Sequence, residues 1–266
     1  MLVFPNAKIN LGLFITEKRT DGFHNLESLF LPIPLCDILE VTVTTEDTSL
    51  VCTGESSDIP TEKNIVYKAW RLLQEACGIG PVKIHLHKII PSGAGMGGGS
   101  SDGTFMLKAL NELFNLNLSI DRLEELSAQL GSDCPFFVQN KAALISGRGE
   151  VVNPVDFSLG GKYLELVNPS IHISTAQAFQ GIQPQPSNFD WKKLIESQEL
   201  NKTLSNDFEP QVFNLFPEIQ IIKERLLNAG AYYASMSGTG STVYGIFNEK
   251  PEIEWSEKYF HRTFLL

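Results

Sequence analysis

The strongest constraint on this chain is a glycine-rich run at residues 91–101, Pro91-Ser92-Gly93-Ala94-Gly95-Met96-Gly97-Gly98-Gly99-Ser100-Ser101. It lies between an alternating segment that predicts a strand, Val82–Lys88, and an amphipathic segment that predicts a helix from about residue 101 to 114. Glycines permit positive φ and let a ligand approach the backbone, and N–H groups at a helix start attract anions. The run predicts a phosphate-binding loop, with a flexible linker as the alternative. The hydroxyls of Ser100 and Ser101 can bind phosphate oxygens or a magnesium-bound water.

Two common kinds of phosphate loop fit this run poorly. Gly93, Gly95 and Gly98 satisfy G-x-G-x-x-G, but that dinucleotide fingerprint is normally followed by a helix and then a second strand. Here the next segment, Asp121–Leu130, predicts another helix. No lysine follows the glycines, so the P-loop pattern fails. A nicotinamide- or flavin-binding oxidoreductase stays an alternative that rests on the fingerprint alone.

The other segments mix strands and helices. Strands are expected over Lys8–Ile15 and Ile38–Thr45, with turn chemistry at Thr20-Asp21-Gly22 between them. This mixture, without strict β-α-β alternation, favours an α+β fold. A second domain is expected to begin near residue 153, which divides the chain into 1–152 and 153–266. The remaining expectations are helices over Asn64–Ala76 and Pro217–Asn228, strands over Tyr163–Val167, Tyr232–Met236 and Ser241–Phe247, and a proline-rich loop over Gln183–Ser187.

Composition narrows the class of protein. The 266 residues are 42% hydrophobic and carry a formal net charge of −10, which is typical of a globular protein and unlike a nucleic-acid binder. No apolar run is long enough to span a membrane, and Met1–Asn10 does not resemble a secretion signal. The four cysteines are dispersed, which indicates free thiols. We therefore expect a cytoplasmic protein that binds neither membranes nor nucleic acid.

The pair His85 and His87 is the one feature that suggests a metal site. Both histidines fall on the polar face of the strand expected over Val82–Lys88, and no third ligand lies nearby in the sequence. A solvated strand face explains them better. The sequence identifies no protein side chain as a metal ligand, beyond the suggestion of Ser101.

Three ordered segments resemble the motifs of the GHMP kinases, the superfamily of galactose, homoserine, mevalonate and phosphomevalonate kinases. They are Pro5–Leu11, the glycine run at 91–101, and Met236–Ser241. The resemblance implies a two-domain GHMP kinase fold. In it, a ribosomal protein S5 domain 2-like N-terminal domain (1–152) binds ATP, and a ferredoxin-like C-terminal domain (153–266) binds the substrate.

Further segments resemble one branch of the superfamily, which phosphorylates 4-diphosphocytidyl-2-C-methyl-D-erythritol in the non-mevalonate isoprenoid pathway. The implied reaction moves the γ-phosphate of ATP, with Mg²⁺, to the 2-hydroxyl of this small molecule, in a monomer or homodimer. A kinase of the homoserine or mevalonate type and a non-catalytic nucleotide sensor are the alternatives. The segments that carry the resemblance are Lys8–Leu11, Asp21–Leu26, Gly97–Asp102, Leu130–Phe137, Gly147–Glu150 and Asn206–Glu209.

The resemblance also implies catalytic roles. Asp133 corresponds to the catalytic aspartate, which takes the proton of the hydroxyl, and Lys8 corresponds to the catalytic lysine. Lys8 and Asn10 fall on one face of their strand, opposite Ile9 and Leu11. Because the protein is acidic and its ligands are anionic, we expect a local cationic pocket built from backbone N–H groups, Lys8 and magnesium.

The remaining site residues are assigned by the same resemblance. Phe23 and His24, with Phe179 across the ring, are expected to hold the cytosine by stacking. Asn10 and Thr175 are expected to contact the polyol or phosphates of the substrate, and Asn64 and Lys88 to lie near the base of ATP.

Three positions at or beside these motifs raise specific questions. Phe23 stands where many relatives carry tyrosine, so a hydrogen bond through that hydroxyl is lost. Gly103 stands where relatives carry alanine, at a cost of about 0.5–1 kcal/mol in a helix. Asp102, a charge beside a phosphate loop, is expected to point outward or to cap the helix.

Overall fold

The structure is a computed structural model that describes residues 1–55, 59–200 and 203–266. The chain forms two compact units from interleaved segments. The first unit contains Met1–Ala7, Leu35–Ser92 and Gly97–Lys141, and the second contains Lys8–Pro34, Gly93–Met96 and Ala142–Leu266. The boundary expected between residues 152 and 153 stays a prediction.

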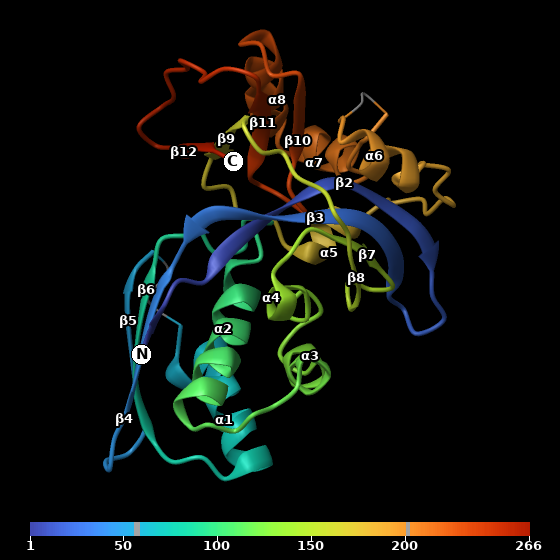
Figure 1. Ribbon diagram of the computed structural model, residues 1–266. Helices are drawn as coiled ribbons and strands as arrows, with labels where there is room; N and C mark the ends of the chain where they lie inside the picture. The colour runs from blue at the N-terminus through green and yellow to red at the C-terminus, as the bar shows by residue number, and fades with distance from the viewer. Residues whose placement is uncertain (56–58, 201–202) are drawn as a thin grey trace. The chain divides into compact units, whose positions relative to one another are not determined.

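The first unit is built on a four-stranded sheet. Its strand order is β1 (Leu2–Val3), β4 (Ile38–Val43), β6 (Val82–Lys88), β5 (Ser49–Gly54). β4 pairs antiparallel with β1 and β6, and β5 runs parallel to β6 (Figure 1). The strand predicted over Val82–Lys88 is confirmed, and Val82, Ile84 and Leu86 are buried on one of its faces, as strand alternation requires. Lys88, at the end of the same face, is buried as well.

Helices cover one face of this sheet: η1 (Thr61–Lys63), α1 (Ile65–Cys77), α2 (Gly98–Leu113), α3 (Ile120–Ala128) and α4 (Phe136–Gln139). α1 confirms the helix predicted over Asn64–Ala76, with Asn64 as its N-cap and Gly78 in the left-handed region at its end. α2 begins inside the glycine run, earlier than predicted. Glycine is a poor helix former, so tertiary packing of the later turns sets this start.

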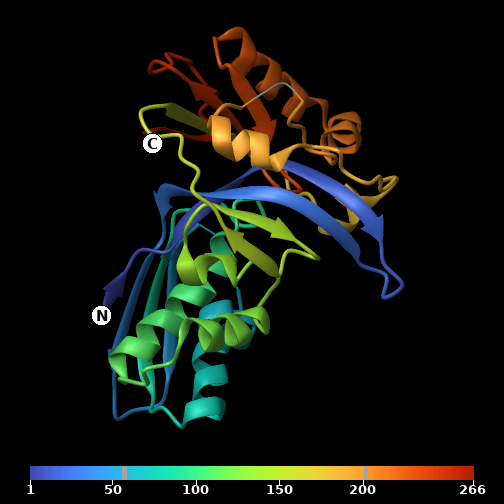
Figure 2. The ribbon, with the colours of Figure 1, turned by 45° about the vertical axis from the view of Figure 1, so that its right-hand side comes forward.

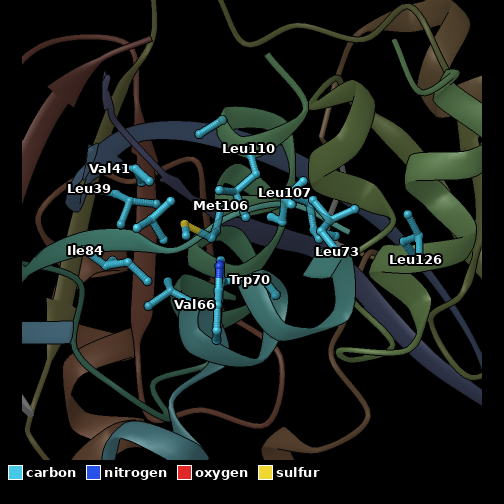
Figure 3. Packing of buried hydrophobic residues seen from close by; sticks show 14 of the residues in the cluster. Leu39, Val41, Val66, Trp70, Leu73, Ile84, Met106, Leu107, Leu110 and Leu126 are labelled. Carbon is cyan, nitrogen blue, oxygen red and sulfur yellow. The ribbon is translucent and has the colours of Figure 1, made fainter. Parts of the chain in front are cut away.

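That packing is the core of the first unit (Figure 3). Leu39 and Val41 of β4 and Ile84 of β6 meet apolar side chains of the helices over the sheet. Burial of each large side chain contributes about 1.5–3 kcal/mol. From the helices, the core includes Val66, Trp70 and Leu73 of α1, Met106, Leu107 and Leu110 of α2, and Leu126 of α3.

The second unit contains two further sheets. One has the order β2 (Asn6–Lys18), β3 (His24–Cys36), β7 (Ala143–Ser146), β8 (Val151–Pro154), with the ends Asn6–Ala7 and Leu35–Cys36 counted in the first unit. The other has the order β10 (Tyr233–Met236), β11 (Val243–Phe247), β9 (Tyr163–Asn168), β12 (Phe260–Leu265). The sequence analysis assigned no element to β3, because Pro32 and Pro34 interrupt its pattern. Both lie beyond the segment Ser28–Phe30 that pairs with β7.

The described residues of the second unit form the helices α5 (Thr175–Phe179), α6 (Trp191–Ser197), α7 (Glu209–Leu215) and α8 (Pro217–Asn228). α8 has the bounds that the sequence predicts, with Pro217 in its first turn. Ile219, Ile222 and Leu226 of α8 join the core of this unit, where α8 lies along β10 and β11 (Figures 1 and 2).

The chain end after Asn248 carries no recognised motif, yet it forms β12, which pairs antiparallel with β9. Glu165 of β9 is buried and accepts hydrogen bonds from Trp255 Nε1, at 2.8 Å, and from the Thr263 hydroxyl. These contacts attach the last segment to the sheet. Sheets with mixed pairings and helices confirm the α+β class. Within the described ranges, no helix is both long and apolar enough to cross a bilayer.

Candidate active site

The first and third motifs meet part of the glycine run within the second unit. Lys8 is 3% exposed, and its ammonium donates hydrogen bonds to Asn10 Oδ1 at 2.5 Å and to the carbonyl of Gly95 at 3.2 Å. It also lies 4.2 Å from the centroid of the Phe30 ring. The contact confirms that Lys8 and Asn10 share a strand face. The structure therefore places a buried cation against the backbone of the predicted phosphate loop.

Ser237 of the third motif completes this group. Its hydroxyl donates to the Gly95 carbonyl at 2.8 Å and accepts from the backbone N–H of Asn10 at 3.3 Å. The amide of Asn10 donates to the Ser28 hydroxyl at 3.0 Å, and the Tyr244 hydroxyl donates to the Asn10 carbonyl at 2.6 Å. Asn10 is thus held at both its side chain and its backbone.

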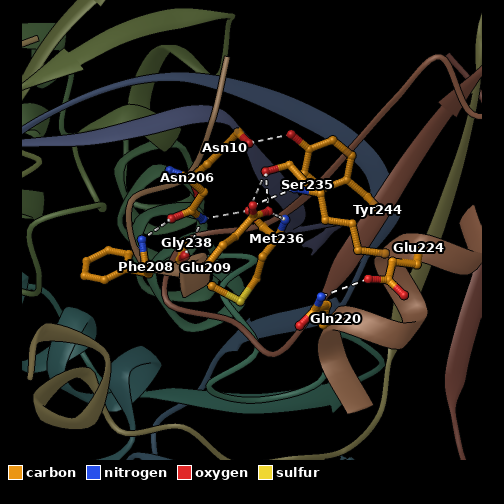
Figure 4. A network of polar contacts seen from close by, with 11 residues as sticks. Asn10, Asn206, Phe208, Glu209, Gln220, Glu224, Ser235, Met236, Gly238 and Tyr244 are labelled. Carbon is orange, nitrogen blue, oxygen red and sulfur yellow. Dashed lines mark hydrogen bonds and ion pairs between the residues drawn. The ribbon is translucent and has the colours of Figure 1, made fainter. Parts of the chain in front are cut away.

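The stretch from Asn206 to Glu209 holds the third motif by hydrogen bonds (Figure 4). Asn206 Nδ2 donates to the carbonyls of Met236 and Gly238, both at 2.8 Å. Glu209 Oε1 accepts from the Met236 N–H at 2.8 Å, and its Oε2 accepts from Lys223 Nζ at 2.6 Å. Because Asn206 and Glu209 are buried, loss of either side chain leaves a backbone group of the third motif unsatisfied. This gives a physical reason for the Asn206–Glu209 stretch that the sequence analysis noted.

Of the three aromatic residues predicted to hold a base, His24 and Phe179 stack on each other, whereas Phe23 is exposed. His24 and Phe179 stack at 4.7 Å with 24° between their planes, and Phe179 also meets the edge of Phe208 at 4.8 Å. Burial, with the nearby charge of Lys18, lowers the pKa of His24, which favours its neutral form. Phe23 is 55% exposed, and its ring lies 4.9 Å from the guanidinium of Arg148. Thr175 is exposed at the start of α5, the helix that ends at Phe179.

In the first unit, the remainder of the glycine run begins α2. Gly97 takes a left-handed conformation with φ 69°, and no described side chain caps the helix. The N–H groups of the first turn of α2 therefore have no partner within the helix and no capping side chain among the described residues. Such N–H groups can bind an anion. The Ser101 hydroxyl is fully buried and has no hydrogen-bond partner among the described residues. An oxygen donor of this kind suits a hard cation such as magnesium. Within the described ranges, no group of three His, Cys, Asp or Glu side chains is placed to hold a metal.

Asp102 does not point outward or cap the helix, which corrects the expectation from the sequence. Asp102 is 2% exposed, and its Oδ2 lies 2.7 Å from Lys88 Nζ. The ammonium of Lys88 also pairs with Asp37. Burial raises the pKa of Asp102 to about 8, against the opposing effect of Lys88 and with a further rise from Asp37. The sequence analysis missed Asp37. Its signal is one carboxylate inside the apolar segment Leu35–Leu39.

Asn64 and Lys88, predicted to lie near the base of ATP, both have structural partners. Asn64 Oδ1 caps α1 by accepting from the Val66 N–H at 3.1 Å, and its amide donates to Cys52 Sγ at 3.3 Å. The ammonium of Lys88 is paired with two carboxylates. Their predicted contacts with ATP stay predictions.

Asp133 is half-buried in the turn that precedes α4. α2 holds this turn through the Thr104 hydroxyl, which donates to the Cys134 carbonyl at 2.9 Å. It also holds α4, because Lys108 Nζ donates to the Phe137 and Val138 carbonyls at 3.3 and 3.1 Å. Asp133 belongs to the first unit and Lys8 to the second. Their joint action stays a prediction.

Gly103 has a packing explanation. A β-carbon at this position would lie 2.7 Å from Ile65 Cγ1 and 3.4 Å from Leu130 Cδ1. The side chain of Ile65 therefore occupies the space that an alanine methyl group would need, so glycine lets α1 approach α2 closely.

A cavity of about 1200 Å³ lies in the second unit, next to the stretch from Asn206 to Glu209 that holds the third motif. It is lined by residues from Gly181–Asp190, from Thr203–Asn214, and by Phe14 and Lys193. None of the predicted site residues lines it. The candidate site therefore consists of the motif residues and does not include this cavity.

Comparison with known proteins supports the resemblance. Residues 64–141 match the model of the GHMP kinases N terminal domain, and residues 188–255 match that of the GHMP kinases C terminal domain. A solved mevalonate kinase from L. major superposes with a TM-score of 0.64 at 19% identity over 94% of this chain and 87% of that chain. At that identity the likeness concerns the fold alone.

Closer relatives share one name. The 4-diphosphocytidyl-2-C-methyl-D-erythritol kinase of Bacteroides fragilis is 49% identical over 95% of this chain and 94% of its own length. That of Parabacteroides distasonis is 44% identical over 100% and 98%. A crystal structure of 4-(cytidine 5'-diphospho)-2C-methyl-D-erythritol kinase superposes with a TM-score of 0.78 at 32% identity, over 92% of this chain and 90% of that chain. The chain belongs to the 4-diphosphocytidyl-2-C-methyl-D-erythritol kinase family of the GHMP kinases.

Proposed function

We propose that this chain transfers the γ-phosphate of ATP to the 2-hydroxyl of 4-diphosphocytidyl-2-C-methyl-D-erythritol, a step of the non-mevalonate isoprenoid pathway. The main support for this proposal is that Lys8 and Ser237 both donate hydrogen bonds to the Gly95 carbonyl. These three residues come from the three different motifs. Kinases of the homoserine or mevalonate type stay less favoured, because the relatives with high identity carry the name of the cytidyl kinase.

In the proposed reaction, Asp133 accepts the proton of the 2-hydroxyl as its oxygen bonds to the γ-phosphorus. The bond from that phosphorus to the bridging oxygen breaks, and ADP leaves. Lys8 offsets the negative charge on the transferred group. The N–H groups of Gly98 and Gly99 at the start of α2, with the loop residues 91–97, bind the phosphates of ATP.

Magnesium, when bound with ATP, neutralises charge on the β- and γ-phosphates. The Ser101 hydroxyl is proposed to contact this magnesium ion or a water bound to it. The hydroxyl is buried and lacks a hydrogen-bond partner within the described residues. Asn64 and Lys88 are proposed to lie near the base of ATP.

The substrate is proposed to bind through its cytosine and its polyol. Phe23, His24 and Phe179 supply stacking surfaces, and the lowered pKa of His24 keeps a neutral imidazole that can donate and accept. Asn10 and Thr175 contact the polyol or phosphates. Residues 1–152 are proposed to form the domain that binds ATP, and residues 153–266 the domain that binds the substrate, with Asn10, Phe23 and His24 of the N-terminal part also contacting the substrate. The protein is proposed to be a cytoplasmic monomer or homodimer.

A coupled assay of ADP release tests this function. The purified chain is incubated with MgATP and, in separate reactions, with 4-diphosphocytidyl-2-C-methyl-D-erythritol, homoserine or mevalonate. Release of one ADP per phosphorylated product with the cytidyl substrate alone supports the proposal. Faster turnover of homoserine or mevalonate, or tight NAD binding without ADP release, would overturn it.

A further inference from the structure

The two ends of the glycine run are joined by one buried ionic cluster in the first unit. Lys88, the last residue of β6, precedes the run, and Asp102 follows it in α2. Lys88 Nζ lies 2.7 Å from Asp102 Oδ2 and pairs also with Asp37 Oδ2. The three side chains are 8%, 2% and 0% exposed, so water does not screen these contacts.

Asp37 adds a second set of contacts at the start of the run. Its Oδ1 accepts hydrogen bonds from the backbone N–H groups of Ile89, at 2.5 Å, and Ile90, at 2.8 Å. These two residues immediately precede Pro91. One carboxylate therefore fixes the backbone that leads into the run and, through Lys88, the helix that leaves it.

We propose that Asp37 and Asp102 are positioning residues that act through Lys88, holding the two ends of the segment 89–101 at a fixed separation and thereby setting its geometry for nucleotide binding. This inference rests on the proposed function, since it assigns the nucleotide phosphates to that segment.

The physical reason is the flexibility of the segment. Its glycines give the segment many accessible backbone conformations, and ordering them on binding costs free energy. A salt bridge across its ends removes part of that cost before the nucleotide arrives. Because all three polar side chains are buried, removal of one leaves the others without a partner for hydrogen bonding or charge, which makes the cluster sensitive to single substitutions.

The test measures equilibrium binding of MgADP by calorimetry, without the second substrate. Asp37→Asn is expected to weaken binding about tenfold, since the charge that pairs with Lys88 is lost. Glu165→Gln is the matched control, because Glu165 is an equally buried carboxylate with two donors in the other unit. It is expected to bind MgADP within about twofold of the unmodified chain at a temperature where both variants are folded.

Asp102 supplies a second test that does not depend on the folding of Asp37→Asn. Asp102→Ala removes the contact between Lys88 and the start of α2 and is expected to weaken MgADP binding about fivefold. Asp102→Asn keeps an oxygen for the Lys88 ammonium and is expected to restore binding to within about twofold. Hydrogen exchange should show faster exchange at Ile89 and Ile90 in Asp37→Asn but not in Glu165→Gln.

Two outcomes overturn the inference. One is a folded Asp37→Asn or Asp102→Ala with unchanged MgADP binding. The other is an equal loss of binding in Glu165→Gln, which would mean that general destabilisation is the cause. If the unmodified chain itself fails to bind MgADP, the proposed function fails instead.

Discussion

A β-carbon at Gly95 would lie 1.9 Å from the carbonyl oxygen of Ser237. The second and third motifs thus touch at a point where no other side chain fits. Gly95 also has φ +78°, a conformation that is strained for residues with a β-carbon. Glycine is therefore needed at this position for packing and backbone conformation, whether or not it also contacts phosphate.

Gly95→Ala should therefore disrupt the group around Lys8. We expect kcat/KM to fall more than about 100-fold, since a backbone clash displaces the loop and the Lys8 ammonium that it holds. The control is Gly80→Ala, where a β-carbon would meet Phe114 at 3.8 Å and the backbone is not in the left-handed region. Steady-state kinetics of both variants check the prediction, and near-normal activity of Gly95→Ala would contradict it.

Lys8→Ala and Asp133→Ala should fold and lose nearly all turnover. Loss of a general base typically costs about 10²–10⁴-fold in rate, and removal of a charge that stabilises the transferred group costs about 10²–10³-fold. Thermal unfolding shows whether each variant folds, and single-turnover kinetics with saturating MgATP show whether the chemical step is lost. Turnover close to that of the unmodified chain in either variant would remove that residue from the mechanism.

Phe179→Leu should raise KM for the cytidyl substrate without changing KM for ATP. Phe179 stacks on His24, and its loss removes a flat surface from the proposed cytosine site. Stacking of an aromatic pair is worth about 0.5–1.5 kcal/mol, so we expect KM for the cytidyl substrate to rise about tenfold at most while KM for ATP stays unchanged. Phe105→Leu on α2, in the other unit, is the control. An equal rise in KM for ATP would show that Phe179 acts on the whole unit rather than on the cytidyl site.

The carboxyl of Asp102 should make stability depend on pH. Its pKa in the folded protein is about 8, raised by burial from 3.8. Between these values the folded state binds a proton that the unfolded state has released, so the free energy of unfolding falls as pH rises. The loss approaches about 1.4 kcal/mol per pH unit for one fully coupled group. Above pH 8 both states are ionised and this dependence ends.

Urea unfolding of the unmodified chain and Asp102→Asn at pH 5 to 9 measures this effect. The difference in the free energy of unfolding should shift in favour of Asp102→Asn up to about pH 8 and then level off. Lys88 and Asp37 face the carboxyl and are unchanged in both proteins. A constant difference across this range would show that Asp102 is ionised throughout.

Local sequence determined much of the secondary structure. The helices α1 and α8 and the strand β6 follow from apolar spacing, from Asn64 and Gly78 at the ends of α1, and from Pro217 at the start of α8, because these signals act within a few residues. The ordered motifs indicated the superfamily, and the comparisons confirm it. The same local reasoning left out β3 and β12. Prolines interrupt the pattern of β3, and β12 depends on pairing with β9, about 100 residues away in the sequence.

Only the tertiary structure decided what the charged residues at the site do. Sequence placed Lys8 and Asn10 on one strand face but left open whether that face is solvated. The fold buries both and brings Gly95 and Ser237 against them. It also turns Asp102 inward to Lys88 and Asp37, contrary to the outward orientation that its charge suggested. The physical reason is that a buried carboxyl group is tolerated when a buried cation accompanies it, here Lys88. The second carboxylate that pairs with this cation, Asp37, lies far away in the sequence. The glycine run alone thus predicts an anion site, and distant side chains determine how its ends are held.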